Sequence, residues 1–427
     1  MTFILFCSFF FALIIGVPIA VCLGFSAVFT LILSGSTPLI IGTQTMFKGV
    51  DSFPLMAIPF FILAGNIMSV GGISKRLVAF AMAFMGKVTG GLAMVSIFAS
   101  MIFAAISGSS PATTAAIGSV MLPSMVRQGY KGSFAAATVA AAGTVGQVIP
   151  PSVPMVIYGV LANVSISQLF VAGLFPGILM GVAMMFIAYL YAKRNGLKQA
   201  EQSQEAADEH PKKAVFSSLW AIMMPCIILG GIYSGIFTPT EAAAVAVFYG
   251  LFVGLCIYRE MRLSDLPKIL FDSACATAVI MFIMATANYF GWILTSQRIP
   301  QAIAQFFLNV TNNKYVLLLL FNIILLIAGC FLNPSAAIVL LTPILLPVLT
   351  NVGVPPILTG IIMVVNLAIG QTTPPVGACL YVACNISGIK LEPIIKESVP
   401  YLLALILALF LITYVEAIAL FPLYFFN

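Results

Sequence analysis

The stretch Gly146-Gln-Val-Ile-Pro-Pro151 occurs twice in this chain, the second time as Gly370-Gln-Thr-Thr-Pro-Pro375. Adjacent prolines remove backbone N–H donors and clash with the preceding turn, so a helix that contains them must unwind. Apolar residues flank both copies. Each copy therefore predicts an apolar helix that is broken in its middle, over about 133–163 and about 357–387.

Two further pairs of segments lie in nearly the same register as the two breaks, whose offset is 224 residues. Ser109–Ala112 matches Leu332–Ser335 with an offset of 223, and the run ending at Asn66 matches the run ending at Asn288 with an offset of 222. Such co-linear matches indicate an internal duplication. We expect a first repeat over 1–192, a cytoplasmic connecting loop over 193–213 and a second repeat over 214–427.

Each repeat also contains a polar turn between two apolar arms, over about 88–127 and about 315–351. A charged amphipathic segment precedes each pair of arms, at about 73–87 and about 299–312. Two apolar arms that meet at a polar turn predict a re-entrant helical hairpin in each repeat. The alternative is an ordinary pair of spans joined by a short loop.

The composition places these segments in a membrane. Of the 427 residues, 62% are hydrophobic and 7% are charged, whereas soluble proteins average about 45–50% and about 25%. Unbroken apolar runs of about twenty residues favour helical spans over a β-barrel. We therefore expect an all-α polytopic membrane protein and exclude a soluble globular enzyme. Residues 2–33 form either one kinked span or two spans separated at Gly16-Val-Pro18, and the duplication favours two.

The basic residues orient this arrangement, because they crowd cytoplasmic connections. If the hydrophilic stretch Lys193–Lys213 lies inside, 15 of the 18 Lys and Arg residues fall on that side. The exceptions are Lys48, Arg298 and Lys314. The same scheme makes the first hairpin open to the cytoplasm and the second to the opposite side, so we expect inverted repeats.

Inverted repeats with broken helices are typical of secondary transporters, in which unwound carbonyls bind Na⁺ near the membrane midplane. Sodium suits carbonyl and hydroxyl oxygens and needs no carboxylate. The first candidate sodium site comprises Ser107, Gly108, Ser109, Ser110, Thr113, Gly143, Gly146, Gln147 and Val148. The second comprises Asn333, Pro334, Ser335, Gly370, Gln371, Thr372 and Thr373. The alternative is that these residues only pack and hydrogen-bond the helices together.

The candidate residues for an anionic substrate are Arg298, Ser109, Ser110 and Ser335. Arg298 follows an apolar span on the side with few basic residues, and an arginine can hold a carboxylate through two parallel hydrogen bonds. Alternatively, Arg298 is an interfacial residue that extends its charge to water. In that case the amides and hydroxyls of the hairpin tips form the anion site.

Glu241 lies beside an apolar helix in the sequence Thr238-Pro-Thr-Glu241. It is either a proton carrier or the last residue of a capping box, in which a threonine at the N-cap and a glutamate three residues later bond to each other's amides. The spacing favours the capping box.

Five segments carry a resemblance to a known family: SGSSPATTAAIGSVMLP, GQVIPPS, FTPTEAAAVAVFYG, NPSAAIVLLTPILLP and GQTTPPVG. They are similar to signatures of the large membrane subunit of tripartite ATP-independent periplasmic (TRAP) transporters, over nearly the whole chain. The resemblance implies Na⁺-driven import of organic anions, typically four-carbon dicarboxylates or sialic acid, across a bacterial inner membrane. It also implies two partners, a small membrane subunit and a periplasmic substrate-binding protein.

The resemblance further implies an elevator-type transport domain between scaffold helices. We expect both hairpins and both broken helices to move, and the flanking spans to stay in place against the lipid bilayer and the partners. The segments 73–87 and 299–312 would connect the two parts. No nucleic-acid partner is expected.

Other classes of function fit the sequence less well. An ion channel would need a ring of pore residues from an oligomer, whereas the duplicated design lies within one chain. An intramembrane enzyme would need a nucleophile with its base or a metal-ligand set, and the single His lies outside the apolar spans. No GxxxxGK[ST] motif occurs, so we expect no nucleotide hydrolysis through a P-loop. A stand-alone divalent-anion/sodium symporter without a binding protein is the main alternative.

Overall fold

The computed structural model describes residues 1–35, 38–86, 88, 90–196, 211–311 and 313–425, and most of the predicted connecting loop lies outside these residues. In the described part of the chain all regular elements are helices. The first half contains α1 (Thr2–Ile14), α2 (Ile19–Ser34), α3 (Ile40–Val50), η1 (Phe53–Met56), α4 (Ala57–Val70), α5 (Ile73–Met85), α6 (Gly91–Ser107), α7 (Ser110–Arg127), α8 (Gly132–Gly143), η2 (Thr144–Gln147), α9 (Val153–Ala162) and α10 (Ile166–Arg194). The second half contains α12 (Pro211–Tyr233), α13 (Pro239–Phe252), η3 (Val253–Ile257), η4 (Leu263–Asp265), α14 (Leu266–Ser296), α15 (Ile299–Val310), α16 (Lys314–Phe331), α17 (Pro334–Asn351), α18 (Pro356–Gly370), α19 (Ala378–Ser387), α20 (Leu391–Tyr414), α21 (Ala417–Leu420) and η5 (Phe421–Phe425).

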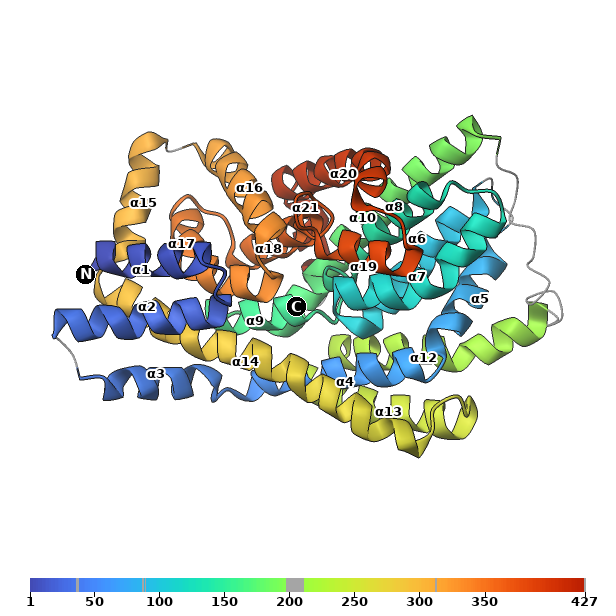
Figure 1. Ribbon diagram of the computed structural model, residues 1–427, viewed down its shortest axis with the longest axis horizontal. Coiled ribbons are helices and arrows are strands. Elements are labelled where there is room, and N and C mark those ends of the chain that lie inside the picture. The colour runs from blue at the N-terminus through green and yellow to red at the C-terminus, as the bar shows by residue number, and fades with distance from the viewer. Residues whose placement is uncertain (36–37, 87, 89, 197–210, 312, 426–427) are drawn as a thin grey trace.

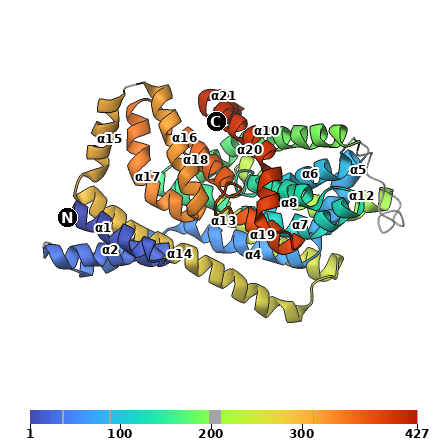
Figure 2. The same cartoon turned by 45° about the horizontal axis from the view of Figure 1, so that its top comes forward.

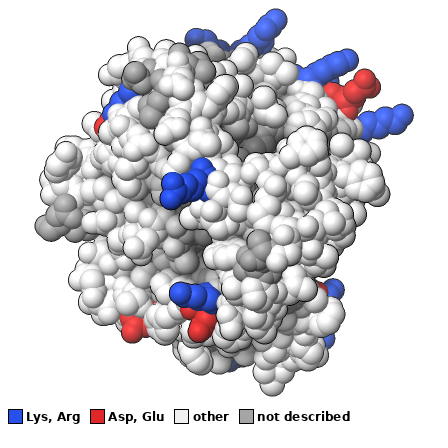
Figure 3. Space-filling view, turned by 90° about the vertical axis from the view of Figure 1, so that its left-hand side faces the viewer, with Lys and Arg blue, Asp and Glu red and all other residues white. Residues whose placement is uncertain are grey.

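The helices have the lengths and compositions of membrane spans. Among the described residues, seven helical segments are long and apolar enough to cross a membrane. Large apolar side chains are also exposed on the outside of the molecule, for example Phe186 on α10 and Phe282 on α14. Figure 3, which looks onto the end where α15 lies, shows a surface with few charged side chains. These features confirm the expected all-α polytopic membrane protein.

The helices form two layers (Figures 1 and 2). The scaffold layer contains α1 to α4 and α12 to α14, in which α2 and α3 pack against α14 and α13 packs against α4. The hairpin layer contains α6 to α10 and α16 to α20. The helices α5 and α15 lie near opposite ends of the molecule, between the two layers.

The contacts within the layers occur as exchanged pairs. In the register of the duplication, α2 corresponds to α13, α7 to α17 and α9 to α19. The structure packs α2 on α14 and α13 on α4, and likewise α7 on α19 and α17 on α9. Two intertwined repeats related by a two-fold axis would produce such an exchange. The inverted orientation of the repeats in a membrane, and the re-entrant nature of the hairpins, remain predictions.

The N-terminal segment consists of two helices rather than one kinked helix. Gly16 has a φ of +88°, which favours glycine, and Pro18 is the N-cap of α2. Because proline has no N–H, it cannot continue the hydrogen bonds of α1. The structure therefore shows the separation that the duplication favours.

The capping box at the start of α13 is confirmed. The Glu241 amide donates to the Thr238 hydroxyl at 3.3 Å, and the Thr238 amide donates to a Glu241 carboxylate oxygen at 2.8 Å. Pro239 is the first residue of the helix. Both bonds satisfy backbone donors that an uncapped helix end would leave unpaired.

Close glycine contact joins α16 to α18 in the hairpin layer. A Cβ atom added to Gly370 would lie 2.4 Å from the carbonyl carbon of Gly329, so the two backbones touch at this point. A methyl group there cannot be accommodated unless the helices separate. Gly291 in α14 offers a contrast, because a Cβ added there meets nothing within 4 Å.

We predict that Gly370→Ala destabilises the protein by roughly 1–3 kcal/mol, because overpacking forces α16 and α18 apart. The measurement is the thermal unfolding midpoint in detergent, with Gly291→Ala as the control. The control keeps or raises the midpoint, since alanine is the better helix former. Equal midpoints for both variants would contradict the packing argument.

We also predict that Glu241→Ala lowers the stability of α13 by roughly 0.5–2 kcal/mol, as the loss of a helix cap typically does. Glu241→Gln should remain close to the wild type, because its amide oxygen still accepts from the Thr238 N–H. Thermal unfolding of both variants tests this. A glutamine variant as unstable as the alanine variant would show that the carboxylate charge, rather than the cap, is required.

Candidate functional site

Both broken helices have the interruptions that the double prolines predict. In the first repeat α8 ends at Gly143, η2 follows, and α9 begins only at Val153. The Ser152 hydroxyl accepts from the Met155 amide at 3.3 Å, which caps α9, and donates to the Gln147 carbonyl at 2.6 Å. In the second repeat α18 ends at Gly370 and α19 begins at Ala378. The Pro150–Pro151 and Pro374–Pro375 peptide bonds are cis.

The first hairpin turns at Gly108, whose φ is +61°. Three oxygens gather at this turn. The hydroxyl oxygens of Ser107 and Thr113 lie 2.6 Å apart, and the Thr113 hydroxyl donates to the Ser109 carbonyl at 2.9 Å. The Ser109 carbonyl thus lies beside two hydroxyl groups at the start of α7.

Glycines of the first break pack directly against this tip. A Cβ added to Gly146 would lie 2.5 Å from the Thr113 hydroxyl oxygen and 2.6 Å from the Ser109 carbonyl oxygen. A Cβ added to Gly143 would lie 1.8 Å from the Thr114 hydroxyl oxygen. Glycine at both positions therefore lets the unwound backbone of the break approach the oxygens of the tip.

The second tip has a different set of oxygens. Asn333 is the N-cap of α17, and its side-chain oxygen accepts from the Ser335 amide at 3.0 Å. The residues that correspond to Thr113 and Thr114 are Ala336 and Ala337, which carry no hydroxyl. The threonine hydroxyls of this repeat lie on the break instead, where Thr372 and Thr373 donate to the Ile369 carbonyl at 3.0 and 2.9 Å.

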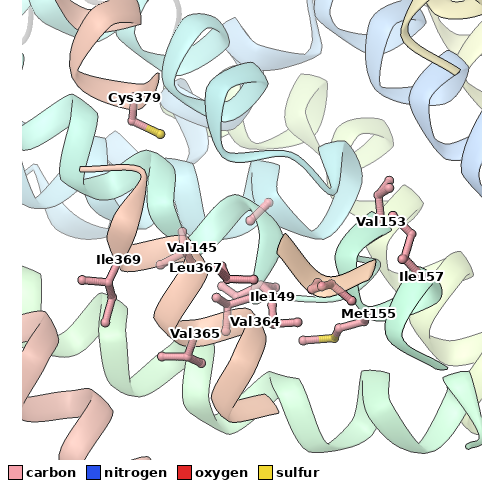
Figure 4. Close-up of a cluster of buried hydrophobic side chains, with 14 of the residues drawn as sticks. Val145, Ile149, Val153, Met155, Ile157, Val364, Val365, Leu367, Ile369 and Cys379 are labelled. Atoms are coloured by element: carbon pink, nitrogen blue, oxygen red, sulfur yellow. The ribbon is translucent and has the colours of Figure 1, made fainter. Parts of the chain in front are cut away.

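A buried apolar interface joins the two breaks. Figure 4 shows Val145 and Ile149 of the first break close to Val364 and Leu367 of α18, and η2 and α9 pack against α18. These four side chains are at most 4% exposed. The two breaks are thus held together as one unit.

Both tips and both breaks meet at one cavity of about 270 Å³, between the hairpin layer and the scaffold layer. From the hairpin layer the lining residues are Ser107, Gly108, Ser109, Pro111, Ala112, Gln147, Val153, Pro154, Asn333, Pro334, Ser335 and Gln371. From the scaffold layer they are Ile62, Gly65 and Asn66 on α4 and Ala276 and Ile280 on α14. None of these lining residues is ionisable, so backbone N–H groups, amides and hydroxyls supply its polarity.

The residues of the two predicted sodium sites are distributed between the cavity wall and the protein behind it. Those that line the cavity are Ser107, Gly108, Ser109, Gln147, Asn333, Pro334, Ser335 and Gln371. Those outside the lining set are Ser110, Thr113, Gly143, Gly146, Val148, Gly370, Thr372 and Thr373. The Ser110 hydroxyl is buried and donates to the Thr144 carbonyl at 3.2 Å, so it joins the tip to the break. The Val148 carbonyl lies beside Gly173 of α10.

Arg298 lies outside the cavity. It is exposed at the N-cap of α15, with a φ of +55°, and is absent from the lining residues. The structure therefore does not bring Arg298 together with the serines of the tips in this conformation. Its predicted contact with substrate remains a prediction.

The scaffold wall of the cavity was missed by the sequence reasoning. Asn66 donates to the Ser273 hydroxyl at 2.8 Å, while Ala276 and Ile280 are apolar residues within a long helix. Asn66 could have been found from the sequence, because it ends one of the repeated segments, but the repeat alone does not indicate a role in the cavity. Ala276 and Ile280 carry no signal in the sequence, since their place depends on how the two layers pack.

The described residues contain no group of three or more His, Cys, Asp or Glu side chains that could bind a metal ion. The tips offer carbonyl and hydroxyl oxygens instead. Such neutral oxygen ligands suit a hard monovalent cation such as Na⁺. The cavity also faces the first turns of α7 and α17, where the positive ends of the helix dipoles favour an anion.

Comparison with known proteins identifies the family. Residues 6–418 match the family model of the tripartite ATP-independent periplasmic transporter, DctM component. The chain is 44% identical over 398 residues to the C4-dicarboxylate TRAP transporter large permease protein of Pseudomonas aeruginosa. The aligned residues cover 93% of this chain and 92% of that protein. It is 39% identical to the sialic acid TRAP transporter large permease protein of Vibrio cholerae, over 93% and 92% of the two chains.

An isethionate TRAP transporter permease protein of Oleidesulfovibrio alaskensis is 49% identical over 96% of this chain, which spans 64% of the length of that relative. The crystal structure of the Alcanivorax borkumensis YdaH transporter has a similar fold, with a TM-score of 0.63 at 16% identity over 87% of each chain. The relatives are permeases rather than enzymes, as expected from the sequence. The chain belongs to the DctM family, the large membrane component of tripartite ATP-independent periplasmic transporters.

Proposed function

We propose that this permease imports a small organic anion together with Na⁺, by moving its hairpin layer along its scaffold layer. The observation that carries the proposal is the convergence of both tips and of Gln147 and Gln371 on one cavity. The relatives are permeases for isethionate, four-carbon dicarboxylates and sialic acid, which are all organic anions. We infer a substrate of that class.

The anion would be held by the first turns of α7 and α17. A helix N-terminus carries about half a positive charge, so two of them at one cavity attract a carboxylate or sulfonate without a basic side chain. Ser109 and Ser335 line the cavity at these turns and add hydroxyl groups. Ser110 is buried beneath them and would support the turn rather than contact the substrate.

Sodium would be held behind the anion, where each tip meets its break. In the first repeat the Ser109 carbonyl and the hydroxyls of Ser107 and Thr113 are the ligands that we favour, because they already lie within hydrogen-bonding distance of one another. In the second repeat we expect most sodium ligands to be carbonyls of the break near Gly370, since the second tip has fewer hydroxyls. A cation close to the tips also stabilises a bound anion, which couples the two ligands.

The partners and location follow from the family. We infer that the chain works in a bacterial inner membrane with a small membrane subunit and receives its substrate from a periplasmic binding protein. The exposed apolar side chains of the scaffold layer suit contact with lipid or with the small subunit. The alternative is a stand-alone symporter that needs no binding protein.

The test of this function is uptake by proteoliposomes that contain the chain and its small subunit. Isethionate, four-carbon dicarboxylates and sialic acid are offered with and without matched binding proteins, under an inward Na⁺ gradient. We expect uptake that needs both Na⁺ and a binding protein. Full uptake without the binding protein supports the stand-alone symporter, and full uptake with K⁺ replacing Na⁺ on both sides contradicts sodium coupling.

In the same assay, we predict that Thr113→Ala raises the Na⁺ concentration needed for half-maximal uptake. A hydrogen bond or ligand contact to a charged group contributes about 1.5–3 kcal/mol, so the increase is about ten- to a hundredfold. Ser119→Ala is the control, because it removes an exposed hydroxyl from the same helix. An unchanged Na⁺ dependence in Thr113→Ala would remove Thr113 from the proposed sodium site.

For Arg298 we predict an effect on substrate if the arginine contacts the carboxylate in another conformation. Arg298→Ala should then weaken the apparent affinity about ten- to a hundredfold, and Arg298→Lys should restore only part of it, because lysine lacks the planar fork. Uptake is compared at equal membrane abundance. Wild-type half-saturation in both variants would assign anion binding to the hairpin tips alone.

A further inference from the structure

One face of α4 forms part of the scaffold wall of the cavity. Ile62, Gly65 and Asn66 have the i, i+3, i+4 spacing of residues that share a helix face. In the duplication, with its offset of 222 residues here, they correspond to Met284, Ala287 and Asn288 on α14. That second set has the same spacing and retains the terminal asparagine.

The same face of α14 already contributes to the cavity. Ala276 and Ile280 line it, and Met284 and Ala287 continue the face at steps of four and three residues. In this structure Met284 is fully buried and Ala287 is 5% exposed. A continuous stripe along α14 is thus open to the cavity at one end and covered at the other.

Met284 and Ala287 are buried because the two hairpins pack differently against the scaffold layer. The first hairpin packs through α6 against both α4 and α5. In the described residues the corresponding helix α16 has at most marginal contact with α14 and meets α15 through the rings of Phe321 and Phe307, whose centroids lie 5.3 Å apart, whereas α17 packs along both α14 and α15. The hairpin layer is therefore placed toward one end of the scaffold, although the scaffold itself carries both copies of the lining face.

We propose that Met284, Ala287 and Asn288 line the substrate cavity in the opposite-facing state, as Ile62, Gly65 and Asn66 line it here. This inference rests on the proposed movement of the hairpin layer. The lining residues of α14 would change from 276–280 to 284–288, about eight residues further along. At 1.5 Å per residue, the tips would move about 12 Å along this helix.

Asn288 is the polar residue of this second face. Its amide nitrogen now donates to the Met284 carbonyl at 2.8 Å and contacts the Gly49 carbonyl at 3.4 Å. Asn66 pairs with Ser273 across the same two scaffold elements. Each asparagine thus lies where α14 crosses the α3–α4 segment, on opposite sides of the crossing, and each would offer its amide to substrate when the tips reach it.

Cysteine pairs distinguish the two states. A Cβ at Gly65 would lie 3.4 Å from the Cα of Ser107, so cysteines at these positions are close enough for a disulfide in this structure. At the offsets of 222 and 223 residues the corresponding pair is Ala287 and Cys330, and Cys330 is a native cysteine. Ala287→Cys alone therefore creates the test pair.

The experiment uses the complete transporter with the other native cysteines replaced, and oxidises it with copper phenanthroline. In a variant in which Cys330 is also replaced, we expect cysteines at Gly65 and Ser107 to cross-link. We expect Ala287→Cys to cross-link with Cys330 as the tips move, and this disulfide to stop uptake until it is reduced. The Gly65 and Ser107 pair is scored by cross-linking alone, because Ser107 belongs to the proposed sodium site. Val279→Cys with Cys330 is the control, because Val279 lies on the exposed side of α14 and should not cross-link.

Failure of the Ala287→Cys pair to form in a variant that takes up substrate would overturn the inference and leave the proposed function intact. Cross-linking of both pairs, while the unsubstituted transporter shows no Na⁺-driven uptake, would contradict the proposed function and leave the inference intact. Should Ala287→Cys prevent folding, Asn288→Cys provides a second measurement. A membrane-impermeant maleimide should label it during turnover from the side opposite to the one that labels Asn66→Cys, and labelling of both from one side would contradict the proposal.

Discussion

The structure depends on the need to satisfy backbone that two pairs of prolines have unwound inside a membrane protein. Unpaired carbonyl and N–H groups are costly at membrane depth unless protein or a water-filled cavity meets them. Here the Ser152 hydroxyl bonds to the Gln147 carbonyl, and the Ser110 hydroxyl bonds to the Thr144 carbonyl. The first hairpin tip approaches its break because Gly143 and Gly146 leave room for it. The cavity exists where these requirements meet.

The same constraint explains what the sequence predicts well. Double prolines and the glycines before them act locally, so GQVIPP and GQTTPP predicted where the broken helices would be interrupted. The capping box at Thr238 and Glu241 is equally local. Packing between distant segments cannot be predicted from such local signals. Ala276 and Ile280 line the cavity only because α14 crosses under the tips. Arg298 looked suited to a substrate because it is isolated in the sequence, yet the fold places it at the exposed start of α15.

The two halves of the site are similar in backbone and different in side chains. In the first repeat the hydroxyls of Thr113 and Thr114 belong to the tip, whereas in the second those of Thr372 and Thr373 belong to the break. The two halves therefore share helix ends and glutamines at the cavity and differ in the oxygens behind them. This division fits an anion held by both halves and cations held differently in each.

The central claim is that both tips form one site at which Na⁺ and an anion bind together. Its most direct measurement is the alkylation rate of a single cysteine at Ala112, an exposed residue on the first turn of α7 that lines the cavity. We predict that isethionate, or another anion found to be transported, slows alkylation when Na⁺ is present and has no effect when K⁺ replaces it. Equal rates with and without substrate in Na⁺ would contradict the claim.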